Sequence, residues 1–162
     1  SGEGGCARTP GRGQADSGNR INLMFLPFAD IIVTKDGDPE CRAMADRHYS
    51  RKSKGASLFV GPGKKIVLRN PEGTWLFVWR NSEKRLDGQS GWECTIFRNE
   101  SSLLSSEIIR GCEAYVSGRK YTYVNPRKVR SSNPGFCFLC NGWVKAGISK
   151  DKKLILLVKE IP

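Results

Sequence analysis

Apolar residues recur along this chain with two periods, and these predict seven strands and three helices. Alternating or continuous apolar runs rich in β-branched and aromatic residues predict strands. They occupy residues 28–34, 65–69, 74–80, 91–98, 120–124, 143–148 and 154–161. The turn Asn70-Pro71-Glu72-Gly73 joins the second and third of these strands into a hairpin.

Helical spacing appears in three other segments. Pro39 follows the turn residues Asp36-Gly37-Asp38 and predicts a helix start, with the helix running to about residue 51. A second helix is expected over about residues 104–116, and a short aromatic one ends near Asn141. The apolar faces of the first two helices are Cys41, Met44, Ala45 and His48, and Leu104, Ile108, Ile109, Cys112 and Val116.

The element order is therefore β-α-β-β-β-α-β-α-β-β, in a chain of 162 residues that is long enough to bury a core. This order predicts a single α/β (α+β) domain over residues 23–162, with a mixed, mostly antiparallel central sheet flanked by helices. Residues 1–22 are rich in Gly, Arg and Ser, and we expect a flexible tail, a cloning remnant or a fragment end. No window has the length of a membrane-spanning helix, so no membrane partner is expected.

Formal charge changes this picture, because the chain carries a net charge of +11. Two basic clusters contribute much of it: one over residues 42–54, and one formed by Arg119, Lys120, Arg127, Lys128 and Arg130. Such clusters favour contacts with phosphate groups, and nucleic acid is the commonest partner of that kind. The alternative is a solvated basic surface that keeps the protein soluble.

Six cysteines lie at irregular spacings within apolar runs, which predicts reduced, buried thiols and a cytoplasmic protein. Cys137-Phe-Leu-Cys140 is a lone CxxC, and His48 is the only histidine. A structural zinc site needs a second pair of ligands, for which Cys41 with His48 is the one irregular alternative. We therefore expect no bound metal.

The segment from Lys120 to Phe138 is the most informative part of the chain. Its strand stops at Asn125-Pro126, and a basic loop with Arg127, Lys128 and Arg130 leads into the short helix. A strand end that opens into cationic groups is a common ligand site, here for an anion. Ser131, Ser132 and Asn133 are expected to cap the helix.

This order of elements resembles the GNAT-type N-acyltransferase fold. The resemblance makes 92–98 the central strand, 102–116 the helix that receives the acyl-CoA pyrophosphate and 121–125 the strand that splays away. Residues 133–143 become the last helix, and Asn141-Gly142-Trp143 resembles its closing motif. The segment Arg98-Asn99-Glu100-Ser101-Ser102 replaces the family's glycine-rich phosphate loop and contains no glycine. The resemblance implies an acyl-CoA or related donor held by Arg98, Asn99, Ser101, Ser102 and Asn133.

The motif His48-Tyr49-Ser50-Arg51 further resembles the Mom-type phage DNA-modification proteins, which modify the exocyclic amino group of adenine. The resemblance implies a phage or prophage protein that binds nucleic acid, preferably DNA. The cations assigned to that contact are Arg47, Arg51, Lys52, Arg127, Lys128 and Arg130.

Candidate catalytic residues follow from these two segments. His48, with Tyr49 beside it, can orient or deprotonate an amine, and the alternative is a packed histidine. Glu100 can act as a general base in a cleft that raises its pKa, or as a first-turn carboxylate of the helix. Tyr123 and Asn125 share a strand face and can polarise the transferred group, whereas Tyr121 on that face is expected in the core. Trp75, Trp79 and Trp92 would stack on bases only if exposed.

The sequence thus predicts an N-acyltransferase-like enzyme whose preferred acceptor is adenine in DNA. Two alternatives stay open. One is an acetyl-CoA-dependent N-acetyltransferase for proteins or small molecules, and the other is a nucleic-acid-binding module without catalysis.

Overall fold

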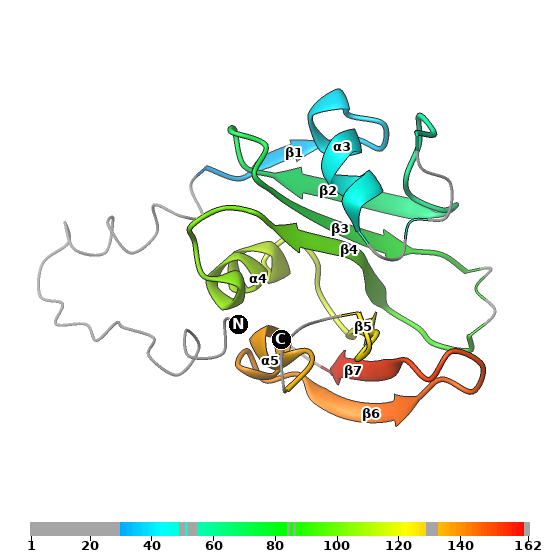
Figure 1. Ribbon diagram of the computed structural model, residues 1–162. Coiled ribbons are helices and arrows are strands. Elements are labelled where there is room, and N and C mark those ends of the chain that lie inside the picture. The colour runs from blue at the N-terminus through cyan, green and yellow to red at the C-terminus, as the bar shows by residue number, and fades with distance from the viewer. Residues whose placement is uncertain are drawn as a thin grey trace, which may run out of the picture.

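The computed structural model describes residues 30–48, 51, 55–83, 85, 87–128 and 133–160. In these ranges the elements follow the predicted order (Figure 1). They are β1 (Ile32–Thr34), α3 (Pro39–Arg47), β2 (Lys64–Arg69), β3 (Trp75–Asn81), β4 (Trp92–Asn99), α4 (Ser105–Glu113), β5 (Lys120–Val124), α5 (Phe136–Leu139), β6 (Val144–Ile148) and β7 (Ile155–Lys159). The expected tail, residues 1–22, lies outside the described residues.

All strands form one seven-stranded sheet in the order β1-β2-β3-β4-β5-β7-β6. Every neighbouring pair is antiparallel except β4 and β5, which run parallel. The predicted mixed, mostly antiparallel sheet flanked by helices is confirmed. The parallel pair requires a crossover, and α4 provides it. Within the described ranges, no helix has the length and apolar character needed to cross a bilayer.

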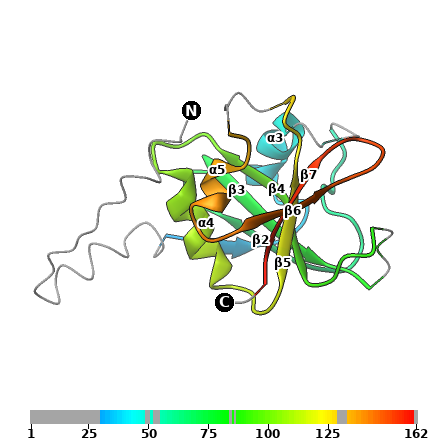
Figure 2. The same cartoon turned by 90° about the horizontal axis from the view of Figure 1, so that it is seen from below.

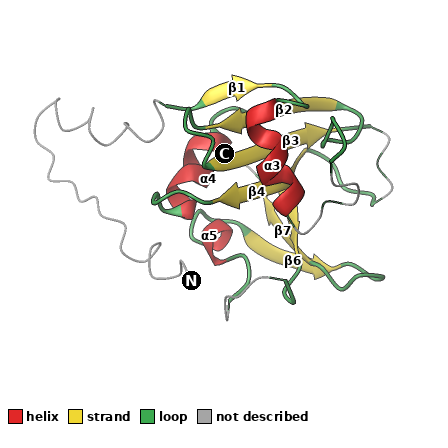
Figure 3. Cartoon of the chain, turned by 45° about the horizontal axis from the view of Figure 1, so that its top comes forward, coloured by secondary structure: helices red, strands yellow, loops and turns green. Residues whose placement is uncertain are grey.

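Helix α3 covers one face of the sheet, crossing β3 and β4 (Figure 3). Asp38 caps it by accepting the Glu40 N–H at 2.8 Å, and Pro39 stands at its first position. Cys41, Met44 and Ala45 are buried against β2, β3 and β4, as the spacing predicts. The helix ends at Arg47, about four residues earlier than expected, because His48 is already extended (φ −76°, ψ 140°).

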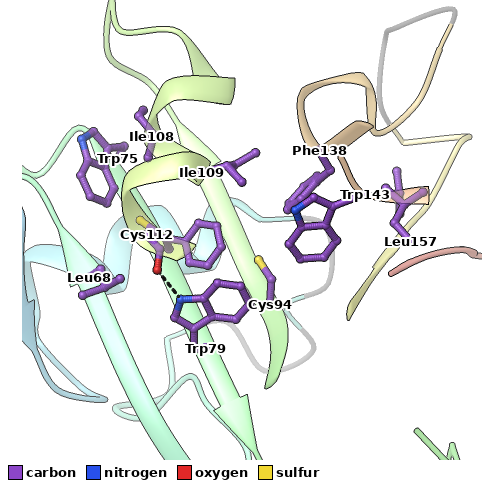
Figure 4. Packing of buried hydrophobic residues seen from close by; sticks show 12 residues of the cluster. Leu68, Trp75, Trp79, Cys94, Ile108, Ile109, Cys112, Phe138, Trp143 and Leu157 are labelled. Atoms are coloured by element: carbon purple, nitrogen blue, oxygen red, sulfur yellow. Dashed lines mark hydrogen bonds between the residues drawn. The ribbon is translucent and has the colours of Figure 1, made fainter. Parts of the chain in front are cut away.

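The other face is covered by α4 and α5, which lie side by side (Figure 2). Here Trp75 and Trp79, both almost fully buried, belong to one core cluster with Ile108, Ile109 and Cys112 of α4 (Figure 4). The Trp79 indole N–H donates to the Cys112 carbonyl at 3.0 Å, and its ring stacks on Trp143 with centroids 6.4 Å apart. These two tryptophans are therefore core residues and cannot stack on bases.

Helix α5 begins differently from the prediction. Its N-cap is Gly135, in the left-handed region at φ 82°, and no side-chain cap is made. A Cβ at this position would lie 2.6 Å from Leu157 Cδ1, so only glycine fits this close approach. Asn133 contributes its carbonyl, which accepts the Phe136 N–H at 3.0 Å, while Ser131 and Ser132 lie outside the described residues.

Candidate functional site

The parallel strands β4 and β5 pair only at their beginnings. Trp92, Glu93 and Cys94 stand opposite Lys120, Tyr121 and Thr122, and the Thr122 hydroxyl donates to the Cys94 carbonyl at 2.8 Å. Beyond this point the two strands continue without pairing to one another. A pocket of about 140 Å³ opens between them, and we call it the strand-gap pocket.

Two local features hold the strands apart. On the β3 side, Val78 pairs with Ile96 and Trp79 with Cys94, so Thr95 is an extra residue in β4 and forms a bulge. A bulge bends its strand and increases the local twist. On the other side, Phe138 of α5 packs edge-on against Phe97, with ring centroids 6.1 Å apart.

The strand-gap pocket is lined by residues from both faces of the sheet. His48 lines it from the α3 side, and the start of α5 lines it from the opposite side. Its walls are mostly apolar. The described lining residues are His48, Cys94, Thr95, Phe97, Thr122, Tyr123, Val124, Gly135, Cys137 and Phe138.

His48 is the predicted catalytic residue that the structure places in this pocket from the helical side. Burial, with the nearby positive charge of Arg98 adding to it, lowers the pKa of the His48 imidazole to about 4. The ring is therefore uncharged at neutral pH. Its predicted neighbour Tyr49 lies outside the described residues.

Tyr123 also lines the pocket, but its hydroxyl is engaged elsewhere. It donates to Asp87 at 3.1 Å, and burial, with the Asp87 charge adding to it, raises the pKa of Tyr123 to about 12. The phenol therefore stays protonated. Tyr121 on the same face is fully buried, as predicted for a core residue, and its ring lies edge-on to Tyr123.

Asn125 shapes the chain instead of facing the pocket. Its side-chain oxygen accepts the Arg127 N–H at 3.0 Å, and its carbonyl accepts the Lys128 N–H at 3.0 Å. This turn ends β5 and presents Arg127 and Lys128 to solvent. Asn125 is not among the described residues that line the strand-gap pocket.

Glu100 stands in an ion cluster beside the pocket. Its two oxygens accept from Nε and Nη2 of Arg47, both at 2.8 Å, and Arg98 Nε also donates to it. These hydrogen bonds lower the pKa of Glu100 to about 2. The expectation of a cleft that raises this pKa is wrong, because two guanidinium groups stabilise the carboxylate. A permanently charged carboxylate is a poor general base.

The glycine-free loop after β4 is organised by Asn99. Its amide nitrogen donates to the Leu103 carbonyl at 2.8 Å and to Ser105 Oγ at 3.0 Å. Its oxygen accepts from the Ser101 N–H at 2.9 Å and the Ser101 hydroxyl at 2.6 Å. Asn99 and Ser101 thus fix the path of the chain into α4, and Ser102 is exposed on it.

Two cations of the first basic cluster are engaged in contacts within the fold, which the sequence does not indicate. Arg51 donates to Asp46 at 2.8 Å and to the Leu58 and Ala56 carbonyls, with a side chain only 8% exposed. The assignment of Arg51 to nucleic acid is therefore wrong, because its guanidinium is used inside the fold. Arg47 is paired with Glu100, and Lys52 lies outside the described residues.

The second basic cluster divides in a similar way. Lys120 is buried and donates to the Gly118 carbonyl at 3.0 Å. Arg119 is bound to Gln89, the Ser90 carbonyl and Glu160. The exposed cations of this cluster are Arg127 and Lys128, whereas Arg130 lies outside the described residues.

Sequence reasoning missed Glu93 and Thr95 of β4, which line a second pocket on the α3 side of the sheet. Burial raises the pKa of Glu93, against the lowering effect of Arg80, whose Nη1 lies 3.3 Å from Glu93 Oε1. Thr95 Oγ1 is buried and has no hydrogen-bond partner among the described residues. The charged residue Glu93 within the apolar run Trp92-Glu93-Cys94 was the one sequence feature that could have indicated this pocket.

The cysteines agree with the expectation except at one position. Cys41, Cys94 and Cys112 are buried free thiols and Cys137 is a half-buried one. Cys140 is exposed and disulfide-bonded, so the prediction of reduced thiols is wrong there. Across the described residues, no three His, Cys, Asp or Glu side chains gather as a metal site would require.

Comparisons with protein-family models, with curated proteins and with solved structures find no match to this chain. The functional assignment therefore depends on the geometry of the site itself.

Proposed function

We propose that this protein is a GNAT-like N-acyltransferase whose acceptor is an amine of nucleic acid, preferably the exocyclic amino group of adenine in DNA. The observation that carries the proposal is the strand-gap pocket, in which uncharged His48 stands between two parting parallel strands. The sheet order and the parallel β4–β5 pair support the same architecture, with β4 in the place of its central strand.

The residues around the pocket suit an acyl-CoA or a related acyl donor. The narrow apolar gap accepts a slender uncharged chain, because Phe97, Val124 and Phe138 form much of its wall. Arg47 and Arg98 together carry one positive charge more than Glu100 neutralises. That charge and the N-terminus of α4 would attract the donor's phosphates.

When bound, such a donor supplies an activated carbonyl carbon. His48 would accept the proton that the acceptor amine loses as its nitrogen bonds to that carbon, and would return the proton to the departing sulfur. Burial favours this role because it keeps the imidazole unprotonated before the reaction. Tyr123 keeps its own proton and fixes Asp87 at the edge of the site.

Nucleic acid as the acceptor is supported by charge. The chain has a net charge of +11, and Arg127 and Lys128 stand exposed directly after the pocket-lining end of β5. Cations in this place would hold a phosphate backbone close to the gap.

Mass spectrometry of nucleosides tests the proposal. DNA and RNA are digested from cells that express the wild-type chain or His48→Ala at matched soluble levels. We expect a new adenosine-derived mass with the wild type and a yield lower by about 100-fold or more with the variant. An unchanged nucleoside profile with the wild type would reject the proposal. If the protein still shifted DNA in a gel, the outcome would favour a binding module.

A further inference from the structure

The second pocket, which we call the acceptor pocket, lies on the α3 side of β4 and has a volume of about 620 Å³. It shares Thr95 with the strand-gap pocket, so the two meet at the β4 bulge. The described lining residues are Arg51, Ala56, Leu58, Phe59, Val60, Gly61, Arg80, Glu93, Thr95 and Ile96.

The two walls of the acceptor pocket differ in chemistry. Phe59 and Val60, from the segment after α3, form an apolar wall together with Ile96. Glu93 and Thr95 of β4 supply polar groups on the strand itself. A flat ring with apolar faces and a polar edge fits this combination.

Thr95 lines both pockets and carries an unpaired hydroxyl. Its Oγ1 is buried without a hydrogen-bond partner in the part of the chain that the structure describes. Buried hydroxyls are nearly always hydrogen-bonded, so the unpaired hydroxyl of a residue that lines both pockets points to a ligand. The bulge explains its position, because Thr95 stands outside the regular pairing of β4 with β3.

Glu93 presents an acceptor on the same wall. Arg80 donates to its Oε1 at 3.3 Å, and the Tyr121 hydroxyl donates to the same oxygen at 3.5 Å. Both contacts orient the carboxylate, and Oε2, which has no hydrogen-bond donor among the described residues, can accept an N–H. The side chain is 18% exposed, so a ligand in the pocket can reach it.

We propose that the acceptor pocket binds a neutral nitrogen heterocycle that carries an exocyclic amino group beside a ring nitrogen, the Watson–Crick edge of adenine. Glu93 Oε2 accepts an N–H of the amino group, and the Thr95 hydroxyl donates to the ring nitrogen. Thr95 is a positioning residue that brings the amino group to the strand-gap pocket. This inference rests on the proposed function, and in duplex DNA the base would have to be flipped out.

Fluorescence anisotropy with single-stranded DNA tests it. One oligonucleotide carries a single central adenine in a thymine run, a second carries an abasic site there, and a third carries 1-deazaadenine. We expect the wild type to bind the adenine strand about 3- to 10-fold tighter than the abasic one, the range of one or two net hydrogen bonds. The 1-deazaadenine strand should lose most of that preference.

Thr95→Val is the isosteric test variant and Thr95→Ser is its matched control. Thr95→Val should bind adenine and 1-deazaadenine equally while keeping the wild-type affinity for the abasic strand, and Thr95→Ser should retain the preference for adenine. Equal wild-type binding of all three strands would overturn the acceptor pocket and leave the proposed transferase standing. A full adenine preference in Thr95→Val would overturn it in the same way. A wild type that binds none of the strands would overturn both.

Discussion

The two halves of β4 have opposite surroundings. Glu93 and Cys94 pair with β3 on one side and with β5 on the other, whereas Ile96–Asn99 pair with β3 alone. Where both neighbours are present, the backbone is satisfied and Cys94 belongs to the main core. Where β5 leaves, a bulge, an unpaired hydroxyl and two pockets appear. The pockets thus open where β5 leaves, although Glu93 and Cys94 of the paired half also line them.

Mutations in the core beside the paired beginning of β4 should act mainly on the stability of the fold. Trp79→Ala removes a fully buried ring that stacks on Trp143 and donates to the Cys112 carbonyl. We expect the free energy of unfolding to fall by about 3–5 kcal/mol. Urea denaturation measures this, with exposed Tyr115→Ala as the control that should change little. A loss below about 1 kcal/mol for Trp79→Ala would contradict the assignment of a packed core.

Loss of the hydrogen bond between Thr122 and Cys94, where the pairing of β4 and β5 ends, should have an intermediate effect on stability. Thr122→Val deletes the buried hydroxyl that donates to the Cys94 carbonyl, so this carbonyl loses a hydrogen bond. The expected loss is about 1–3 kcal/mol. Because the change preserves side-chain volume, cavity formation does not contribute. Thr122→Ser, which keeps the hydroxyl, should lie closer to the wild type, and an equal loss in both variants would argue against the bond.

His48, which lines the strand-gap pocket, makes the stability of the protein depend on pH. The unfolded chain has a histidine pKa near 6.5, and the folded pKa is about 4, so between these values the unfolded state binds more protons. The wild type should therefore lose stability as the pH falls from about 6.5 to about 4, by up to about 1.4 kcal/mol per pH unit.

His48→Gln removes this titration and should flatten that part of the stability curve. Urea unfolding at several pH values from 7.5 to 4.5 compares the two proteins, so all other titrating groups cancel. Parallel curves would show that His48 is not buried in the uncharged form.

The smallest effect is expected at the ion cluster beside the pocket. Glu100→Gln removes a carboxylate whose side chain is 31% exposed and which pairs with Arg47 and Arg98. Solvent screens such pairs, so the expected loss is about 0.2–1 kcal/mol at low salt. The difference from the wild type should shrink in 0.5 M NaCl, as chemical denaturation in both buffers will test. A loss that salt leaves unchanged would indicate a role other than ion pairing.

The fold was largely predictable because its elements depend on local patterns. The Asn70–Gly73 turn, the Pro39 helix start and the apolar spacing of α3 and α4 each specify their elements without distant partners. Tyr121 was likewise assigned to the core from its strand face. The failures at α3 and α5 concern element ends, where Gly135 and extended His48 depend on tertiary contacts.

The site was less predictable, because its chemistry depends on residues that are distant in the sequence. Glu100 meets Arg47 across 53 positions, and this contact reverses the direction of the expected pKa shift. The importance of Thr95 comes from a bulge, which no residue pattern in β4 indicates. His48 was identified because it is the only histidine and begins the motif His48-Tyr49-Ser50-Arg51, and the fold places it in the pocket.

The most direct test of the central claim is calorimetric titration of acetyl-CoA into the wild type and two variants at Cys137. This residue lines the strand-gap pocket from α5. Cys137→Phe fills the pocket and Cys137→Ser nearly preserves its volume, with thermal unfolding as the check that both fold. Donor binding between β4 and β5 predicts that the wild type and Cys137→Ser bind and that Cys137→Phe does not. A wild type that does not bind acetyl-CoA, or a Cys137→Phe variant that binds it equally well, would contradict donor binding between β4 and β5.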